Sequence, residues 1–128
     1  FSNSPVIITA DNASDFYLET NSSGTGLFLG YGGTARTYSS SSVLGGWHQV
    51  VMVKTGAGDN GNLYIDGVLQ TSWTGALGNV PTSPSRDLII GSYYVSGGFF
   101  FNGSLDEVRI YNRALTPAEV KLLYNSGK

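Results

Sequence analysis

The pattern of apolar and polar positions predicts a chain made mainly of short β-strands. Each strand-like run is β-branched, aromatic or alternating, and it ends in a cluster of Gly, Ser, Asn and Asp. We expect about eight strands in all, with signals at 5–10, 16–20, 27–31, 47–55, 63–73, 86–94 and 101–111 and a polar loop or loose edge strand over 32–42. The run 47–55 is the longest and is apolar on both faces, which predicts a central strand.

Two local signals are sharper than the strand pattern. The pair Asp66-Gly67 lies between two alternating runs and predicts a type I′ hairpin turn, which needs positive φ at both central residues. Near the end of the chain, Thr116 followed by Pro117 and by Glu119 predicts an N-cap and a capping box. We therefore expect one short helix over about 116–125.

Composition excludes several classes of protein. The 128 residues suit one domain, and a net charge of −2 with seven scattered basic residues argues against a nucleic-acid partner. No apolar run reaches the roughly 18 residues needed for membrane insertion. Cysteine is absent, so disulfides, thiolate nucleophiles and Cys-ligated metals are all excluded.

The closing stretch "FNGSLDEVRIYNRALTPAEVKLLY" resembles the C-terminal signature of LamG-like jelly-roll domains, in the concanavalin A-like lectin/glucanase superfamily. The stretches "GGWHQVVMVKTGAGDNGNLYIDGVLQ" and "LIIGSYY" resemble that family's upstream motifs in the same order. The resemblance implies an all-β fold, a jelly-roll β-sandwich of two antiparallel sheets with one short C-terminal helix. It also implies an extracellular or cell-surface location.

The resemblance is incomplete before Gly46. Family members usually begin with two further strand motifs, and nothing in 1–45 matches either of them. We therefore expect 1–128 to be a LamG-like jelly-roll domain that lacks the family's N-terminal strands. The open sheet edges would be closed by rearranged strands of this chain, by a complementing N-terminal segment, or by a second copy in a homo-oligomer joined through strand edges, with the run at 5–10 as a plausible donor.

Asp106 is the candidate metal ligand. If 101–111 is a strand, Asp106 shares a face with Val108 and Ile110 and is buried or half-buried, so it needs partners. It would then accept backbone N–H groups or, as the resemblance implies, help to bind a structural Ca²⁺ at the edge of the sandwich.

Catalysis has little support in the sequence. His48 is the only histidine, and no G-x-S-x-G elbow presents a serine. The related glucanases carry carboxylates alternating along one strand, whereas Asp106 and Glu107 are adjacent and would point to opposite faces. We predict that the chain is not an enzyme.

Aromatic residues beside Gly, Ser and Asn are the candidate ligand contacts, because such mixtures stack on sugar rings and hydrogen-bond to hydroxyl groups. The candidate carbohydrate-binding residues are Tyr31, Tyr38, Trp73, Tyr93 and Tyr94. Packing or partner contact is the alternative role for them. In 99–101 three consecutive Phe residues cannot all face inward on a strand, so at least one should be exposed or covered by a partner.

Two functional hypotheses follow from the sequence. The first is a non-catalytic extracellular module that binds carbohydrate or mediates adhesion to a glycan or another extracellular ligand. The second is a self-assembling structural subunit, a strand-edge-joined oligomer or filament without glycan binding.

Overall fold

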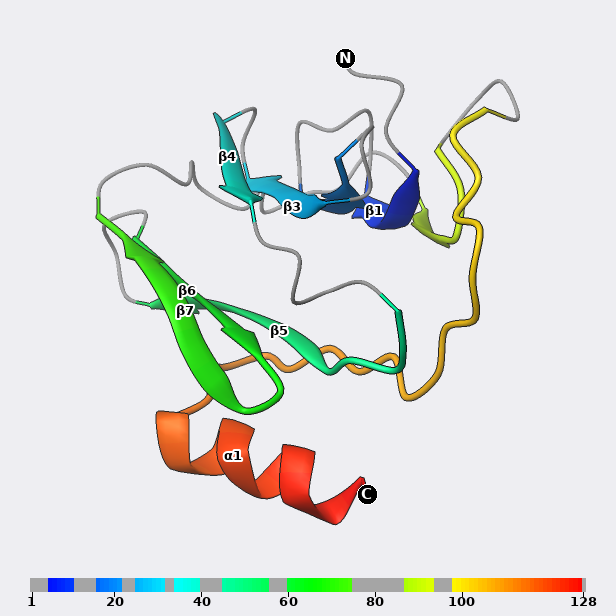
Figure 1. The fold of residues 1–128 in the computed structure, drawn as a ribbon. Coiled ribbons are helices and arrows are strands. Elements are labelled where there is room, and N and C mark those ends of the chain that lie inside the picture. Colours follow the sequence, from blue (N-terminus) through cyan, green and yellow to red (C-terminus); the bar gives the residue numbers. More distant parts are fainter. Residues whose placement is uncertain are drawn as a thin grey trace. The chain divides into compact units, whose positions relative to one another are not determined.

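The computed structural model describes residues 5–10, 16–21, 25–31, 34–39, 45–55, 60–74, 87–93 and 98–127. Eight strands and one helix lie in these ranges: β1 Val6–Ala10, β2 Phe16–Thr20, β3 Gly26–Tyr31, β4 Thr34–Ser39, β5 Val50–Thr55, β6 Asn60–Ile65, β7 Val68–Trp73, β8 Leu88–Ile90 and α1 Pro117–Ser126 (Figure 1). The predicted fold class, an all-β jelly-roll with two antiparallel sheets and one short C-terminal helix, is confirmed.

The chain divides into two compact units. One comprises Phe1–Leu44 and Gly78–Val108, and we call it the five-stranded unit. The other comprises Gly45–Leu77 and Arg109–Lys128, and we call it the hairpin–helix unit. Within the described ranges, no helix has the length and apolar character needed to cross a membrane.

The five-stranded unit is an antiparallel sheet in the order β4-β3-β2-β1-β8, with β2 in the middle. Leu18 of β2 lies opposite Ile8 of β1 on one side and Leu29 of β3 on the other. All three side chains are buried, and their contacts across the strands stabilise the sheet. The strand proposed as a donor to a second copy, β1, is paired on both sides within its own chain.

The hairpin–helix unit is an antiparallel sheet in the order β5-β6-β7, with α1 packed against it (Figure 1). The predicted tight turn is confirmed, because Asp66 and Gly67 join β6 to β7 with φ of 53° and 74°. The core of this unit consists of Val53, Tyr64, Leu115 and Val120, with Val51 and Leu123 partly buried against them. The apolar side of the helix therefore covers apolar side chains of the sheet that the three strands cannot bury by themselves.

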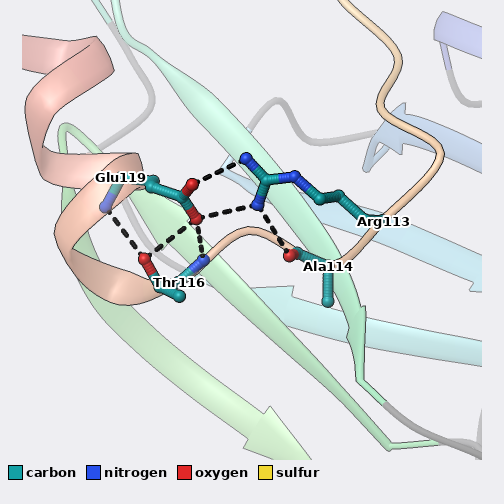
Figure 2. A network of polar contacts seen from close by, with 4 residues as sticks. All are labelled: Arg113, Ala114, Thr116 and Glu119. Carbon is teal, nitrogen blue, oxygen red and sulfur yellow. Dashed lines mark hydrogen bonds and ion pairs between the residues drawn. The ribbon is translucent and has the colours of Figure 1, made fainter.

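The start of the helix agrees with the capping-box prediction. The Glu119 N–H donates to Thr116 Oγ1 at 3.2 Å, and the Thr116 N–H donates to Glu119 Oε2 at 2.7 Å. Arg113 adds a two-pronged ion pair, with its Nη1 and Nη2 donating to Glu119 at 3.0 and 2.6 Å (Figure 2). One carboxylate thus caps the helix and fastens the chain that leads into it.

Two strand predictions are wrong. The segment β5 was expected to be central, but it lies at an edge of the three-stranded sheet. The expected strand at 101–111 does not form: Phe101 donates its N–H to the Gly91 carbonyl at 2.9 Å, and residues 102–111 belong to no strand. Glu107 has φ 53°, outside the extended region, and the chain passes from one unit to the other at this point. An alternating sequence is compatible with an extended backbone, but a strand forms only where a neighbouring strand provides hydrogen-bond partners.

Candidate functional site

Within the five-stranded unit, two of the predicted carbohydrate-binding residues, Tyr38 and Tyr93, lie far apart. Tyr38 lies on β4 and Tyr93 follows β8, and these strands are the two opposite edges of the five-stranded sheet, about 19 Å apart at normal strand spacing. Trp73 is partly buried at the end of β7, in the other unit. Tyr31 is the last residue of β3, and Tyr94 lies outside the described residues.

Tyr93 contacts the aromatic ring of Phe99. Its ring meets that of Phe99 edge-on, with centroids 5.8 Å apart and an interplanar angle of 77°. Phe100 is 63% exposed, which confirms that at least one of the three consecutive Phe side chains faces outward. We call Tyr93, Phe99 and Phe100 the aromatic cluster. Phe99 has φ 60°, a conformation that is uncommon for a bulky residue.

The aromatic cluster is held against the sheet by backbone hydrogen bonds. The Val6 N–H donates to the Phe99 carbonyl at 2.9 Å, and Val6 and Phe100 form a parallel bridge. Gly91 donates to Ile7 at 2.9 Å, which fixes the end of β8 beside β1. The exposed ring of Phe100 is therefore presented from an anchored backbone.

Asp106 is exposed, so the prediction of a buried or half-buried carboxylate is wrong. The reason is that the segment is not a strand, and its alternation places no face against a core. Asp106 Oδ1 accepts the N–H of its neighbour Glu107 at 2.8 Å. In the described parts of the chain, no group of three or more His, Cys, Asp or Glu residues could hold a metal ion. Calcium binding stays a prediction.

Sequence reasoning missed a polar cluster in the hairpin–helix unit. His48 Nδ1 lies 2.8 Å from Asp66 Oδ2, and the Gln49 N–H donates to Asp66 Oδ1 at 3.0 Å. The Asp66 N–H in turn donates to the Gln49 carbonyl at 2.9 Å. Trp47, which precedes His48 in the sequence, is 70% exposed. The partner of His48 is 18 residues away in the sequence, so only the pairing of the strands reveals it.

Glu19 is the buried acid of the described structure. It lies on the central strand β2, between Val6 of β1 and Phe28 of β3, and is 8% exposed. Burial raises the pKa of this carboxyl to about 7, because the charged form is poorly solvated there. Tyr17, two residues earlier, has a raised pKa as well, from burial first and from the charge of Glu19 second.

Comparison with protein families shows to which superfamily the chain belongs. A family model described as the concanavalin A-like lectin/glucanases superfamily matches residues 2–121. The chain belongs to this superfamily. Because that description includes sugar-binding proteins as well as enzymes, membership leaves open which of the two this member of the lectin/glucanases superfamily is. None of the curated proteins compared with the chain matches it.

A solved structure shows the same fold. It is the crystal structure of an S-layer domain-containing protein from Clostridium thermocellum ATCC 27405, with 24% sequence identity and a TM-score of 0.54. The match covers 94% of this chain and 63% of that chain, so the chain spans less than two thirds of the length of this relative. At 24% identity, the similarity between the two chains shows a shared fold alone.

Proposed function

We propose that this chain is a non-catalytic module that binds carbohydrate, or mediates adhesion through it, outside the cell or at the cell surface. The observation that carries the proposal is the aromatic cluster, in which Phe100 is 63% exposed. An exposed ring on an anchored backbone can stack on the apolar face of a sugar at little cost in conformational entropy.

The surroundings of the cluster supply the polar part of such a site. Ser92 lies beside Tyr93, and Asn102 is an exposed amide directly after the Phe residues. These groups can donate to and accept from sugar hydroxyls. Membership in a superfamily described by lectins supports the proposal, and a fold shared with an S-layer domain-containing protein supports the location.

The proposed lack of catalysis rests on the chemistry of glycoside hydrolysis. It needs two carboxyl groups converging across roughly 5–10 Å. The stretch 91–104, which contains the cluster, has no Asp, Glu or His. In the hairpin–helix unit, the carboxylate of Asp66 is paired with His48, and the carboxylate of Glu119 is paired with Arg113.

A glycan array with the folded chain tests the proposal. We expect binding to at least one glycan and a loss of about tenfold or more in affinity for Phe100→Ala, equal to one lost stacking contact. The matched control is Leu122→Ala, an apolar side chain that is 68% exposed in the other unit and should bind like the parent. A parent chain that binds no glycan would overturn the proposal.

Self-association is the second candidate function, and it rests on strand β8. This outer strand has only three residues, and Leu88 and Ile90 on it are 42% and 48% exposed. An exposed apolar edge is a template for a strand of another copy. Sedimentation should then show a dimer or larger assembly that Ile90→Lys dissociates, whereas a monomeric parent at micromolar concentration would contradict this candidate.

A further inference from the structure

The sequence contains two Asn-Gly pairs, one at Asn60 and one at Asn102. The side-chain amide of Asn is thermolabile, and most of all before Gly, because no Cβ then keeps the next backbone nitrogen away from the side-chain carbonyl carbon. The attack of that nitrogen requires an accessible N–H and a backbone that can rotate toward the side chain. The surroundings of the two pairs therefore decide which of them reacts in the folded chain.

The pair at Asn102 lies where the anchored backbone ends. The Phe101 N–H is bonded to the Gly91 carbonyl at 2.9 Å. Beyond it, neither the side chain of Asn102 nor the N–H of Gly103 forms a hydrogen bond with the described residues. Both residues are exposed and belong to no strand. Water can therefore reach the amide, and no ladder of hydrogen bonds holds the Gly103 nitrogen away from it.

Packing explains why Gly stands at position 103. A Cβ built on Gly103 would lie 2.6 Å from Phe101 Cε1, which is closer than real Cβ contacts come. The ring of Phe101 thus lies directly against the backbone of this Gly, a close approach that a larger residue prevents. A side chain that would shield the Asn102 amide cannot be placed there while the ring keeps its position.

The pair at Asn60 is held in a sheet. Asn60 is the first residue of β6 and lies opposite Thr55 of β5. Gly61 is buried, and it is paired with Lys54 on one side and with Trp73 on the other. Because strand pairing fixes an extended backbone, a reaction at this pair has to wait for the sheet to open locally.

We infer that Asn102 is a site of spontaneous deamidation in the folded chain. The backbone nitrogen of Gly103 forms a bond to the side-chain carbonyl carbon of Asn102, and the bond from this carbon to the amide nitrogen breaks. The amide nitrogen leaves as ammonia and takes the proton of the Gly103 nitrogen, so a cyclic succinimide remains. Water then opens one of the two carbonyl–nitrogen bonds of the ring, which leaves aspartate or isoaspartate at position 102. Water is the co-reactant, and no enzyme is needed.

The reaction changes the surface next to the aromatic cluster. The stretch 91–104, which contains the cluster, has no Asp, Glu, His, Lys or Arg, so the new carboxylate is its first charge at neutral pH. Isoaspartate also lengthens the backbone between Phe101 and Gly103, which moves the Gly relative to the ring that lies against it. Because the reaction requires no ligand, the inference does not depend on the proposed function.

Ageing of the parent chain at pH 8, followed by peptide mapping in a mass spectrometer, gives the direct test. In chain unfolded by denaturant, the two Asn-Gly pairs should react at similar rates. In the folded chain, Asn102 should keep that rate, whereas Asn60 should react more slowly by about tenfold or more. Isoaspartate should appear at 102, since only a succinimide yields it. Folded chain that reacts no faster at Asn102 than at Asn60, or that yields aspartate alone, would overturn the inference.

Two variants exclude deamidation that occurs during digestion. Ion-exchange chromatography of the intact aged parent should show an acidic form, because each reaction adds one negative charge to a chain of net charge −2. Asn102→Gln should develop this form far more slowly, since a Gln side chain has to close a larger and less favourable ring. Asn60→Gln is the matched control and should age like the parent. An acidic form that develops at the parental rate in Asn102→Gln would contradict the assignment.

Discussion

Two glutamates, one in each unit, have opposite environments. Glu119 in the hairpin–helix unit receives hydrogen bonds from Arg113 and from the backbone and side chain of Thr116, and these lower the pKa of its carboxyl to about 2. Glu19 in the five-stranded unit is buried on a central strand, and its pKa is raised to about 7. The same side chain is thus stabilised as an anion by local partners and as a neutral acid by burial.

The comparison shows how the two units obtain their stability. In the hairpin–helix unit, the carboxylate of Glu119 lies at the surface, and its partner Arg113 is only six residues away in the sequence. In the five-stranded unit, Glu19 is buried between neighbouring strands, and this burial destabilises its charged form. The units should therefore respond to pH in opposite directions.

The largest expected effect is that of Glu19→Gln. In the unfolded chain this carboxyl ionises near 4.5, and in the folded chain near 7, so the folded state binds more protons between these values. Stability of the parent should fall as the pH rises through this window, by on the order of 3 kcal/mol. The variant should lack this loss, and denaturant unfolding at pH 5 and pH 8 measures it. Glu107→Gln, at an exposed position, is the control. If this variant also lacked the loss of stability between pH 5 and pH 8, the assignment of that loss to Glu19 would be wrong.

The hairpin turn should be the next most sensitive point. Gly67 has φ 74°, and a Cβ there would lie 3.1 Å from Tyr124 Cβ and 3.4 Å from the Lys121 Cα of the helix. We expect Gly67→Ala to reduce the free energy of unfolding by about 2 kcal/mol, through backbone strain and displacement of α1. Gly46→Ala is the matched control, because nothing lies within 4 Å of a Cβ at that position. Equal melting temperatures for the two variants would show that the helix does not rest on the turn.

Removing the charge of Glu119 should have a smaller effect, since the ion pair is exposed and such pairs contribute little. Its lowered pKa means that the contribution is present above about pH 4.5 and is lost as the pH falls toward 2. Glu119→Gln should lower the melting temperature at pH 7 and have little effect at pH 2. Arg113→Gln should cause part of the same loss, and the double variant should lose less than the sum of the two. Strict additivity would show that the pair is not coupled.

The smallest effect is expected at Asp106. A buried carboxylate there would have made Asp106→Ala costly, but the side chain is exposed, so we expect a change within about 0.5 kcal/mol, like that of Glu107→Ala. The same melting experiment with EDTA tests the predicted Ca²⁺. A fall in the melting temperature of the parent that is absent in Asp106→Ala would support a metal at this residue.

The sequence by itself determined the features whose causes lie within a few residues. The capping box of Thr116 and Glu119 joins positions three apart, and the Asp66-Gly67 turn requires two adjacent residues that tolerate positive φ. Most strands were also predicted, because alternation and turn residues are local signals. The outward position of one Phe in 99–101 followed from the pleat alone.

Only the tertiary structure decided which segments became neighbours. The run at 101–111 has the alternation of a strand and forms none, and β5 has an apolar sequence on both faces yet lies at an edge. The pair of His48 and Asp66 joins residues 18 apart, and the four predicted aromatic residues that the structure describes belong to two different units. A strand sequence specifies that a backbone can be extended, whereas its partner is fixed by burial and hydrogen bonding across the whole chain. The contact between His48 and Asp66 depends on tertiary structure in the same way, which is why only the pairing of β5 with β6 reveals it.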